Sequence, residues 1–256
     1  MEEREVSGFG FILGRWPLDQ DKSTVVFIHG SGVTGHFWKA QVEGLVERVN
    51  TVALDLPGHG RSGKDGKDTI ADYSRAVLEF IDALNAPKAI LCGLSLGGAI
   101  VQQLLLDFAE RFGAGILIGT GAKLTVLPAI FEAIEKDYTG FVEMISKFAS
   151  SENTDASVSQ PFRDDLIKCK PKVTYGDFQA CNQFNVIERL DEIRVPVLVI
   201  SAEDDKLTPP KYARFLEDGI PNTARKHIHD AGHIAPMEKP QEVNQAIIEF
   251  LDSHGL

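Results

Sequence analysis

The sequence has few cysteines and no long apolar run, and each of these absences excludes a class of protein. Three cysteines occur in 256 residues, at Cys92, Cys169 and Cys181, and none of them forms a C-x-x-C pair. This usage argues against a disulfide framework or a zinc knuckle and fits a reducing compartment. No apolar run approaches the ~20 residues of a membrane span, and the acidic first residues, MEERE, carry no apolar signal segment. We therefore expect a cytoplasmic protein with no membrane partner.

Basic residues are also in short supply. The chain has 26 Lys and Arg residues against 37 Asp and Glu residues, a formal net charge of −11. Such an acidic chain repels a phosphate backbone, so nucleic acid is not an expected partner. No metal-ligand cluster or cofactor motif is visible, and we expect neither a metal nor a cofactor. The length is sufficient for one large α/β domain.

Short apolar runs alternate with helical patterns along most of the chain, which is typical of a largely parallel sheet covered on both faces. The patterns predict an opening hairpin at residues 6–16 and buried strands at 23–30, 50–60, 88–92, 114–122, 195–205 and 224–233. They predict helices at 37–49, 70–84, 96–112, 210–216 and 240–251. We expect an α/β fold with a mostly parallel, twisted sheet of about eight strands and helices on both faces.

The alternation stops between residues 123 and 186, where the sequence is helix-like and contains no buried strand. Because this segment follows the sixth strand, we expect a helical cap, or lid, inserted over the carboxyl edge of the sheet. The predicted division is a core of residues 1–122 and 187–256 and a cap of residues 123–186. Within the cap, the serine-rich residues 150–160 are expected to form a loop.

A serine in a burst of glycine joins the strand predicted at residues 88–92 to the helix that begins at Leu96. The stretch fits G-x-S-x-G with Gly93, Ser95 and Gly97, and it fits neither glycine motif for phosphate binding. A serine at the tip of so tight a turn has strained backbone angles, and its neighbours two residues away must be nearly free of side chain. The hydroxyl then stands at the positive end of the following helix. Ser95 is the candidate nucleophile.

A serine hydroxyl is a weak nucleophile, so it needs a base, and the base needs an orienting group. Among seven histidines, His233 lies on a loop after the last predicted strand, at the same edge of the sheet as Ser95. We interpret His233 as the base. His29 is expected to brace the loop that follows its strand, and His59 to lie in a tight turn.

The orienting carboxylate is predicted where the strand at residues 195–205 ends, at Asp204 or Asp205. It must reach the far nitrogen of His233, to hold the tautomer of the base and to stabilise the imidazolium. The chemistry of the two residues does not separate them. The chain order of serine, aspartate and histidine is that of α/β-hydrolases, not of chymotrypsin-like or subtilisin-like enzymes.

Five landmarks in order make the sequence resemble the α/β-hydrolase fold superfamily over nearly its full length. They are HGSG, DLPGHGRS, GLSLGG, VPVLVISAEDDKLTP and DAGHIAPMEKP. The family pattern at the acidic strand is G-x-x-D-x-x-x-P, and here Ala202 replaces the glycine while Asp205 stands four residues before Pro209. The resemblance therefore implies Asp205 as the orienting acid.

The resemblance also implies an oxyanion hole formed by the backbone N–H groups of Ser31 and Leu96. Together these features favour a serine hydrolase that cleaves a small carboxylic ester through an acyl-enzyme intermediate. Apolar side chains of the cap are expected to line the pocket, namely Phe131, Phe141, Met144, Phe148 and Phe184.

Two alternatives stay open at this point. The first is a carbon–carbon bond hydrolase that resembles the enzymes of meta-ring-fission products, for which Arg163, Lys168 and Lys170 would supply a basic pocket. The second is a slow ligand-sensing receptor of the same fold. Dehalogenases and epoxide hydrolases of this fold carry aspartate at the nucleophile position, so Ser95 disfavours both.

Overall fold

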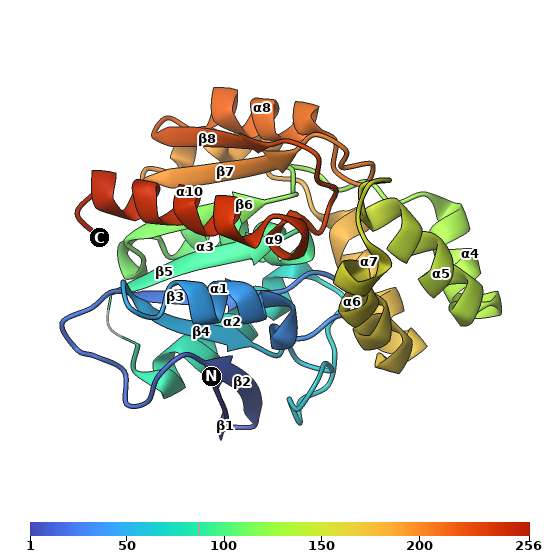
Figure 1. Ribbon diagram of the computed structural model, residues 1–256, viewed down its shortest axis with the longest axis horizontal. Coiled ribbons are helices and arrows are strands. Elements are labelled where there is room, and N and C mark those ends of the chain that lie inside the picture. Colours follow the sequence, from blue (N-terminus) through green and yellow to red (C-terminus); the bar gives the residue numbers. More distant parts are fainter. Residues whose placement is uncertain (87) are drawn as a thin grey trace.

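The computed structural model describes residues 1–86 and 88–256. In this part of the chain, eight strands form one sheet in the order β1-β2-β4-β3-β5-β6-β7-β8. β2 runs antiparallel to both β1 and β4, and all other neighbours are parallel, which confirms the predicted sheet (Figure 1). The strands are β1 (Glu2–Val6), β2 (Phe9–Leu13), β3 (Thr24–Ile28), β4 (Asn50–Leu54), β5 (Ala89–Leu94), β6 (Ala114–Ile118), β7 (Val197–Ala202) and β8 (Thr223–Ile228).

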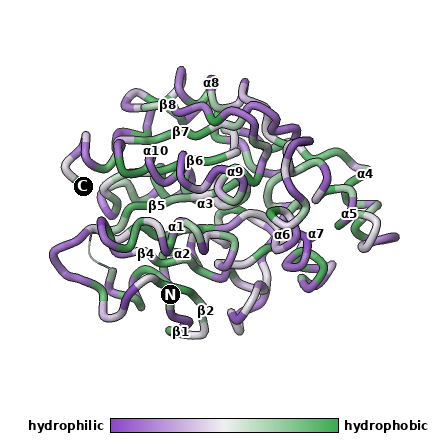
Figure 2. Tube along the Cα trace, in the orientation of Figure 1, coloured by the Kyte–Doolittle hydropathy of each residue, from purple (hydrophilic) through white to green (hydrophobic). Residues whose placement is uncertain are grey.

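Helices cover both faces of the sheet, and the side chains of each central strand alternate between the two cores. Val25 and Phe27 of β3 join the core beneath α1 and α10, whereas Val26 and Ile28 join the core beneath α2 and α3. Both faces are buried, so these strands are apolar along their whole length (Figure 2). The covering helices are α1 (Lys39–Gly44), α2 (Ile70–Leu84), α3 (Leu96–Asp107), α8 (Pro210–Gly219), α9 (Ala235–Glu238) and α10 (Pro240–Ser253), with 3-10 helices at Gly35–Trp38, Ala109–Arg111 and Ile187–Glu192.

Four helices lie between β6 and β7, and Figure 1 shows them gathered at one side of the sheet. They are α4 (Pro128–Lys136), α5 (Tyr138–Ala149), α6 (Ala156–Lys168) and α7 (Pro171–Gln183). A hydrogen bond from the Gly32 N–H to Asp177 of α7 joins them to the loop that follows β3. We call residues 123–186 the inserted segment. None of the described helices is long and apolar enough to cross a membrane.

Several local predictions differ from the structure. The helix expected at residues 96–112 ends at Asp107 and is followed by a 3-10 helix at Ala109–Arg111. The helix expected at residues 37–49 is a 3-10 turn followed by α1, which ends at Gly44. Leu45 and Val49 are both buried and lie four residues apart, so the turn that packs them into the core has the spacing of a helix. The loop expected at residues 150–160 ends early, because Asp155 caps α6 by accepting the N–H of Ser157.

Candidate active site

Ser95 occupies a sharply strained turn between β5 and α3. Its φ of 55° and ψ of −113° lie outside the regions that a serine ordinarily adopts. The turn leaves no space for side chains, since a Cβ at Gly93 would overlap the carbonyl of Gly97, and a Cβ at Gly97 would overlap that of Ile28. The Ser95 N–H donates to the carbonyl of Ile118 at 3.0 Å. The strain is therefore held by contacts with β3 and β6 on either side of β5.

Asp205 and His233 meet at the ends of β7 and β8. Asp205 Oδ2 lies 2.9 Å from His233 Nδ1, and both side chains are buried. Asp205 Oδ1 also accepts the N–H groups of Leu207 and Thr208, at 2.9 and 2.8 Å. Burial alone would raise the pKa of Asp205, but His233 and the donors of Thr208 lower it below its ordinary value. Asp205 is thus held as a carboxylate against the ring.

Asp204 has a different environment. Its Oδ2 accepts the hydroxyl of Ser151, and its N–H donates to the carbonyl of Ala231. Of the two adjacent aspartates, Asp205 is the one that the structure brings to His233.

A cavity of about 240 Å³ lies between the sheet edge and the inserted segment. Ser95 and His233 both line it, together with Gly30 and Ser31 of the loop after β3. A Cβ built on Gly30 would lie 3.6 Å from the Cβ of Ser95, so this loop passes directly beside the serine. Leu96 is the first residue of α3, and its N–H belongs to the turn of the helix that lacks intrahelical partners. The remaining walls are mostly apolar and include Leu124, Val126, Leu127, Ile130, Ile145, Phe162, Leu166, Phe178 and Leu207.

Comparison with known proteins identifies the family of the chain. The model of the alpha/beta hydrolase family matches residues 25–246. The chain belongs to this family. It is 26% identical over 246 residues to a 3-oxoadipate enol-lactonase of Acinetobacter baylyi, a match that spans 91% of this chain and 90% of that protein.

Solved structures resemble this alpha/beta hydrolase over almost its whole length. One described as a thermophilic esterase is 31% identical, with a TM-score of 0.86 over 99% of this chain and 98% of the other. The enol-lactonase of Burkholderia xenovorans is 22% identical, with a TM-score of 0.88 over 98% of this chain and all of that one, and this likeness shows the fold alone. The chain is a hydrolase by family.

The prediction that five apolar side chains of the inserted segment line the pocket of this alpha/beta hydrolase is wrong. Among the described residues, the walls of the cavity beside Ser95 include none of the five. Phe131 packs edge to face on Tyr175, and Phe141 is packed between Tyr138 and Phe178. Met144 packs on the core beneath α5, Phe148 is exposed, and Phe184 is buried in the core beneath α3. Helical spacing identifies apolar faces but does not say which face packs on a neighbouring helix and which meets a cavity.

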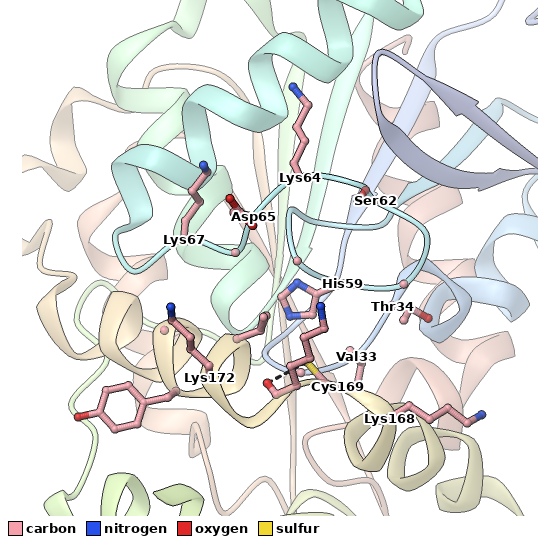
Figure 3. A pocket seen from close by; sticks show the side chains of 18 of the residues that line it. Val33, Thr34, His59, Ser62, Lys64, Asp65, Lys67, Lys168, Cys169 and Lys172 are labelled. Carbon is pink, nitrogen blue, oxygen red and sulfur yellow. Dashed lines mark hydrogen bonds between the residues drawn. The ribbon is translucent and has the colours of Figure 1, made fainter.

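The basic residues considered for a carbon–carbon bond hydrolase also lie elsewhere. Arg163 forms an ion pair with Glu143 on the outer surface of the inserted segment. Lys168 and Lys170 line a second cavity of about 1010 Å³, between residues 58–68 and the turn from α6 to α7. Figure 3 shows that the amines of its labelled lysines, Lys64, Lys67, Lys168 and Lys172, do not converge on one point. Gly32 lines the second cavity, and Ser95 is not among the described residues that line it.

Two residues near the pair of Asp205 and His233 were not predicted from the sequence. The Thr208 hydroxyl donates to Asp205 Oδ2 at 2.7 Å and lies 3.2 Å from His233 Nδ1. Gly119, with a φ of +49°, lies so close that a Cβ there would stand 3.2 Å from His233 Nδ1. Thr208 had a usable signal, because it lies within the acidic-strand landmark. Gly119 had none, because its contact arises only when β6 is placed between β5 and β7.

Proposed function

We propose that this alpha/beta hydrolase is a serine esterase for small, uncharged carboxylic esters and lactones, which uses Ser95, His233 and Asp205 as its catalytic triad. One observation carries the proposal. The strained serine opens into the same cavity as a histidine whose Nδ1 is already bound by a buried carboxylate. This arrangement leaves Nε2 as the nitrogen that can exchange a proton with the serine.

The proposed reaction has two halves. His233 Nε2 takes the proton of Ser95 Oγ as the oxygen attacks the acyl carbon, and the carbonyl oxygen becomes an oxyanion. The N–H groups of Ser31 and Leu96 stabilise this oxyanion, and each such donor is typically worth ~3–4 kcal/mol of barrier. His233 then returns the proton to the leaving alcohol. In the second half, a water gives a proton to His233 as its oxygen attacks the acyl carbon. The bond between the acyl carbon and Ser95 Oγ then breaks, His233 returns the proton to Ser95 Oγ, and the acid is released.

The cavity supports the choice of substrate class. Its volume is below the ~300 Å³ at which pockets for drug-sized ligands begin, and its walls are mostly apolar, so we infer a short acyl chain. Its lysine, Lys206, is engaged with Glu152, with Nζ 2.9 Å from Oε1. No observation favours the carbon–carbon bond hydrolase, since its basic residues line other surfaces. We further propose that residues 123–186 act as a cap, because they form one wall of the cavity.

The test is the hydrolysis of short-chain p-nitrophenyl esters by the wild-type chain and by Ser95→Ala. We expect kcat/KM to fall by about 10³-fold or more in this variant. Ser74→Ala, which removes a buried hydroxyl from α2 outside the cavity, is the control and should retain turnover. A fluorophosphonate should label Ser95 in the wild type. Unchanged turnover in Ser95→Ala, or labelling at another residue, would refute the proposal, and rapid turnover without a partner would exclude the slow receptor.

A further inference from the structure

A fully buried carboxylate on α7 binds three donors from three other parts of the chain. Asp177 Oδ2 accepts the N–H of Gly32 at 2.9 Å and the Nε2–H of His59 at 2.9 Å. Asp177 Oδ1 accepts the hydroxyl of Tyr73 at 2.5 Å. The Asp177 side chain has no exposed surface. A buried carboxylate with three donors is an anchor, because each donor would lose a charge-assisted hydrogen bond if it moved.

The segment that Asp177 anchors is the loop that passes beside Ser95. Gly32 follows Ser31 directly and has a φ of +73°, and a Cβ at Gly32 would overlap Leu166 of α6. The hydroxyl of Thr34, at the far end of the loop, donates to Asp165 of α6 at 2.6 Å. The inserted helices therefore fix this loop from behind at two points, and the peptide between Ser31 and Gly32 has little freedom to rotate.

A negative charge so close to the proposed oxyanion hole would oppose the developing oxyanion unless it were balanced. His59 supplies the balance. Its Nδ1 lies 3.1 Å from the carbonyl of Pro57 and its Nε2 faces Asp177, so both nitrogens meet acceptors and both carry protons. Burial alone would lower the pKa of His59, but the charge and hydrogen bond of Asp177 raise it well above its ordinary value. The pair of Asp177 and His59 therefore carries no net charge. His59 also borders the second cavity (Figure 3).

We propose that Asp177 is a positioning residue for the oxyanion hole: it holds the Gly32 N–H, and so keeps the N–H of Ser31 aimed at the oxyanion, while His59 cancels its charge. The inference rests on the proposed function, since the oxyanion forms only if Ser95 attacks an ester. It gives the inserted segment a part in building the site, in addition to forming a wall of the cavity.

The test compares Asp177→Asn with Tyr138→Phe. Tyr138 is a matched control, because its hydroxyl joins α5 to Leu166 and Thr174 within the inserted segment and is bonded to none of the loop residues 30–34. For a p-nitrophenyl acetate substrate, we expect Asp177→Asn to lower kcat by about 10-fold or more and to leave KM within about 2-fold, because an oxyanion donor acts on the transition state. A short alkyl boronic acid, which forms a tetrahedral adduct with a reactive serine, should bind this variant more weakly by a similar factor. Tyr138→Phe should change neither quantity by more than about 2-fold.

The outcomes separate this inference from the proposed function. Full turnover in Ser95→Ala would overturn both. If Ser95→Ala is inactive and Asp177→Asn keeps wild-type kcat and boronic acid affinity, only the role of Asp177 is overturned. Should Asp177→Asn not fold, nuclear magnetic resonance of the wild type asks the same question. The Gly32 amide should be protected from hydrogen exchange, and its resonance should move when the boronic acid adduct forms. Rapid exchange of this amide in the adduct would overturn the inference.

Discussion

The rings of His29 and His59 meet edge to face with their centroids 4.9 Å apart. Their hydrogen-bond partners make His29 neutral and His59 protonated. His29 Nδ1 donates to the carbonyl of Gly30, whereas its Nε2 accepts the N–H of Leu56. A second proton on His29 would face a donor, so the ring stays neutral. Burial and the nearby charge of His59 lower the pKa of His29 to about 3, while His59 is kept protonated by Asp177.

The two pKa shifts predict that the free energy of unfolding is greatest near neutral pH. Below pH ~6.5 His29 binds a proton in the unfolded chain but not in the folded one, so the free energy of unfolding falls as pH falls. Above pH ~6.5 the folded His59 keeps a proton that the unfolded one releases, so the free energy of unfolding falls as pH rises toward the folded pKa. Each histidine contributes a slope of up to ~1.4 kcal/mol per pH unit on its own side.

The measurement is denaturant unfolding between pH 4.5 and 8.5, with pH steps of about one unit. His29→Asn should be less stable at neutral pH, yet it should lose less stability on acidification than the wild type does. His36→Asn, which changes an exposed histidine, should keep the wild-type slope. An acid slope in His29→Asn equal to that of the wild type would contradict a neutral, buried His29.

Asp204 and Asp205 provide a second test, because they are adjacent in sequence and differ in their contacts. Asp205→Asn should lower kcat by about 10⁴-fold, since an amide opposite His233 Nδ1 favours the wrong tautomer of the base. Asp204→Asn should stay near wild-type activity, because its partner is Ser151. Steady-state kinetics on one ester decide between them. Equal losses in the two variants would argue that the acidic turn, and not one carboxylate, supports the base.

The landmarks of the sequence could predict most of the fold and the residues of the proposed triad, because both depend on local signals. Ser95 can be recognised from Gly93 and Gly97, because the turn leaves no space for a side chain at either position and all three residues lie within five residues of chain. His233 and Asp205 follow strand ends, which parallel topology gathers at one edge. Asp177 has no such local signal. Its partners Gly32, His59 and Tyr73 are 145, 118 and 104 residues away, and only the packing of α7 shows why an aspartate stands there.

The pocket gives a third prediction, because two partly buried phenylalanines of the inserted segment differ in what they face. Phe178 lines the cavity beside Ser95, whereas Phe131 packs on Tyr175 outside it. Phe178→Ala should enlarge the cavity and raise the ratio of kcat/KM for an octanoate ester over an acetate ester by about 10-fold or more, since each accommodated methylene is worth about 1 kcal/mol or more. Phe131→Ala should leave this ratio near the wild-type value. Matching shifts in the two variants would mean that loosening of the helices, and not cavity shape, sets chain-length preference.

Gly97 gives the last prediction, because it lies where α3 crosses β3. A Cβ at this position would overlap the carbonyl of Ile28 and come within 2.8 Å of the carbonyl of His29, so Gly97→Ala must push α3 away from β3. We expect the free energy of unfolding to fall by about 1–3 kcal/mol. The displacement also separates Leu96, at the start of α3, from Ser31, in the loop after β3. We therefore expect kcat to fall further than the loss of folded protein explains.

Gly113→Ala is the control, because its new Cβ would meet nothing closer than Leu256 Cδ2 at 3.5 Å. Chemical denaturation and kinetics of the folded fraction separate the two effects. Wild-type kcat in folded Gly97→Ala would show that the spacing between these two N–H groups does not limit the reaction.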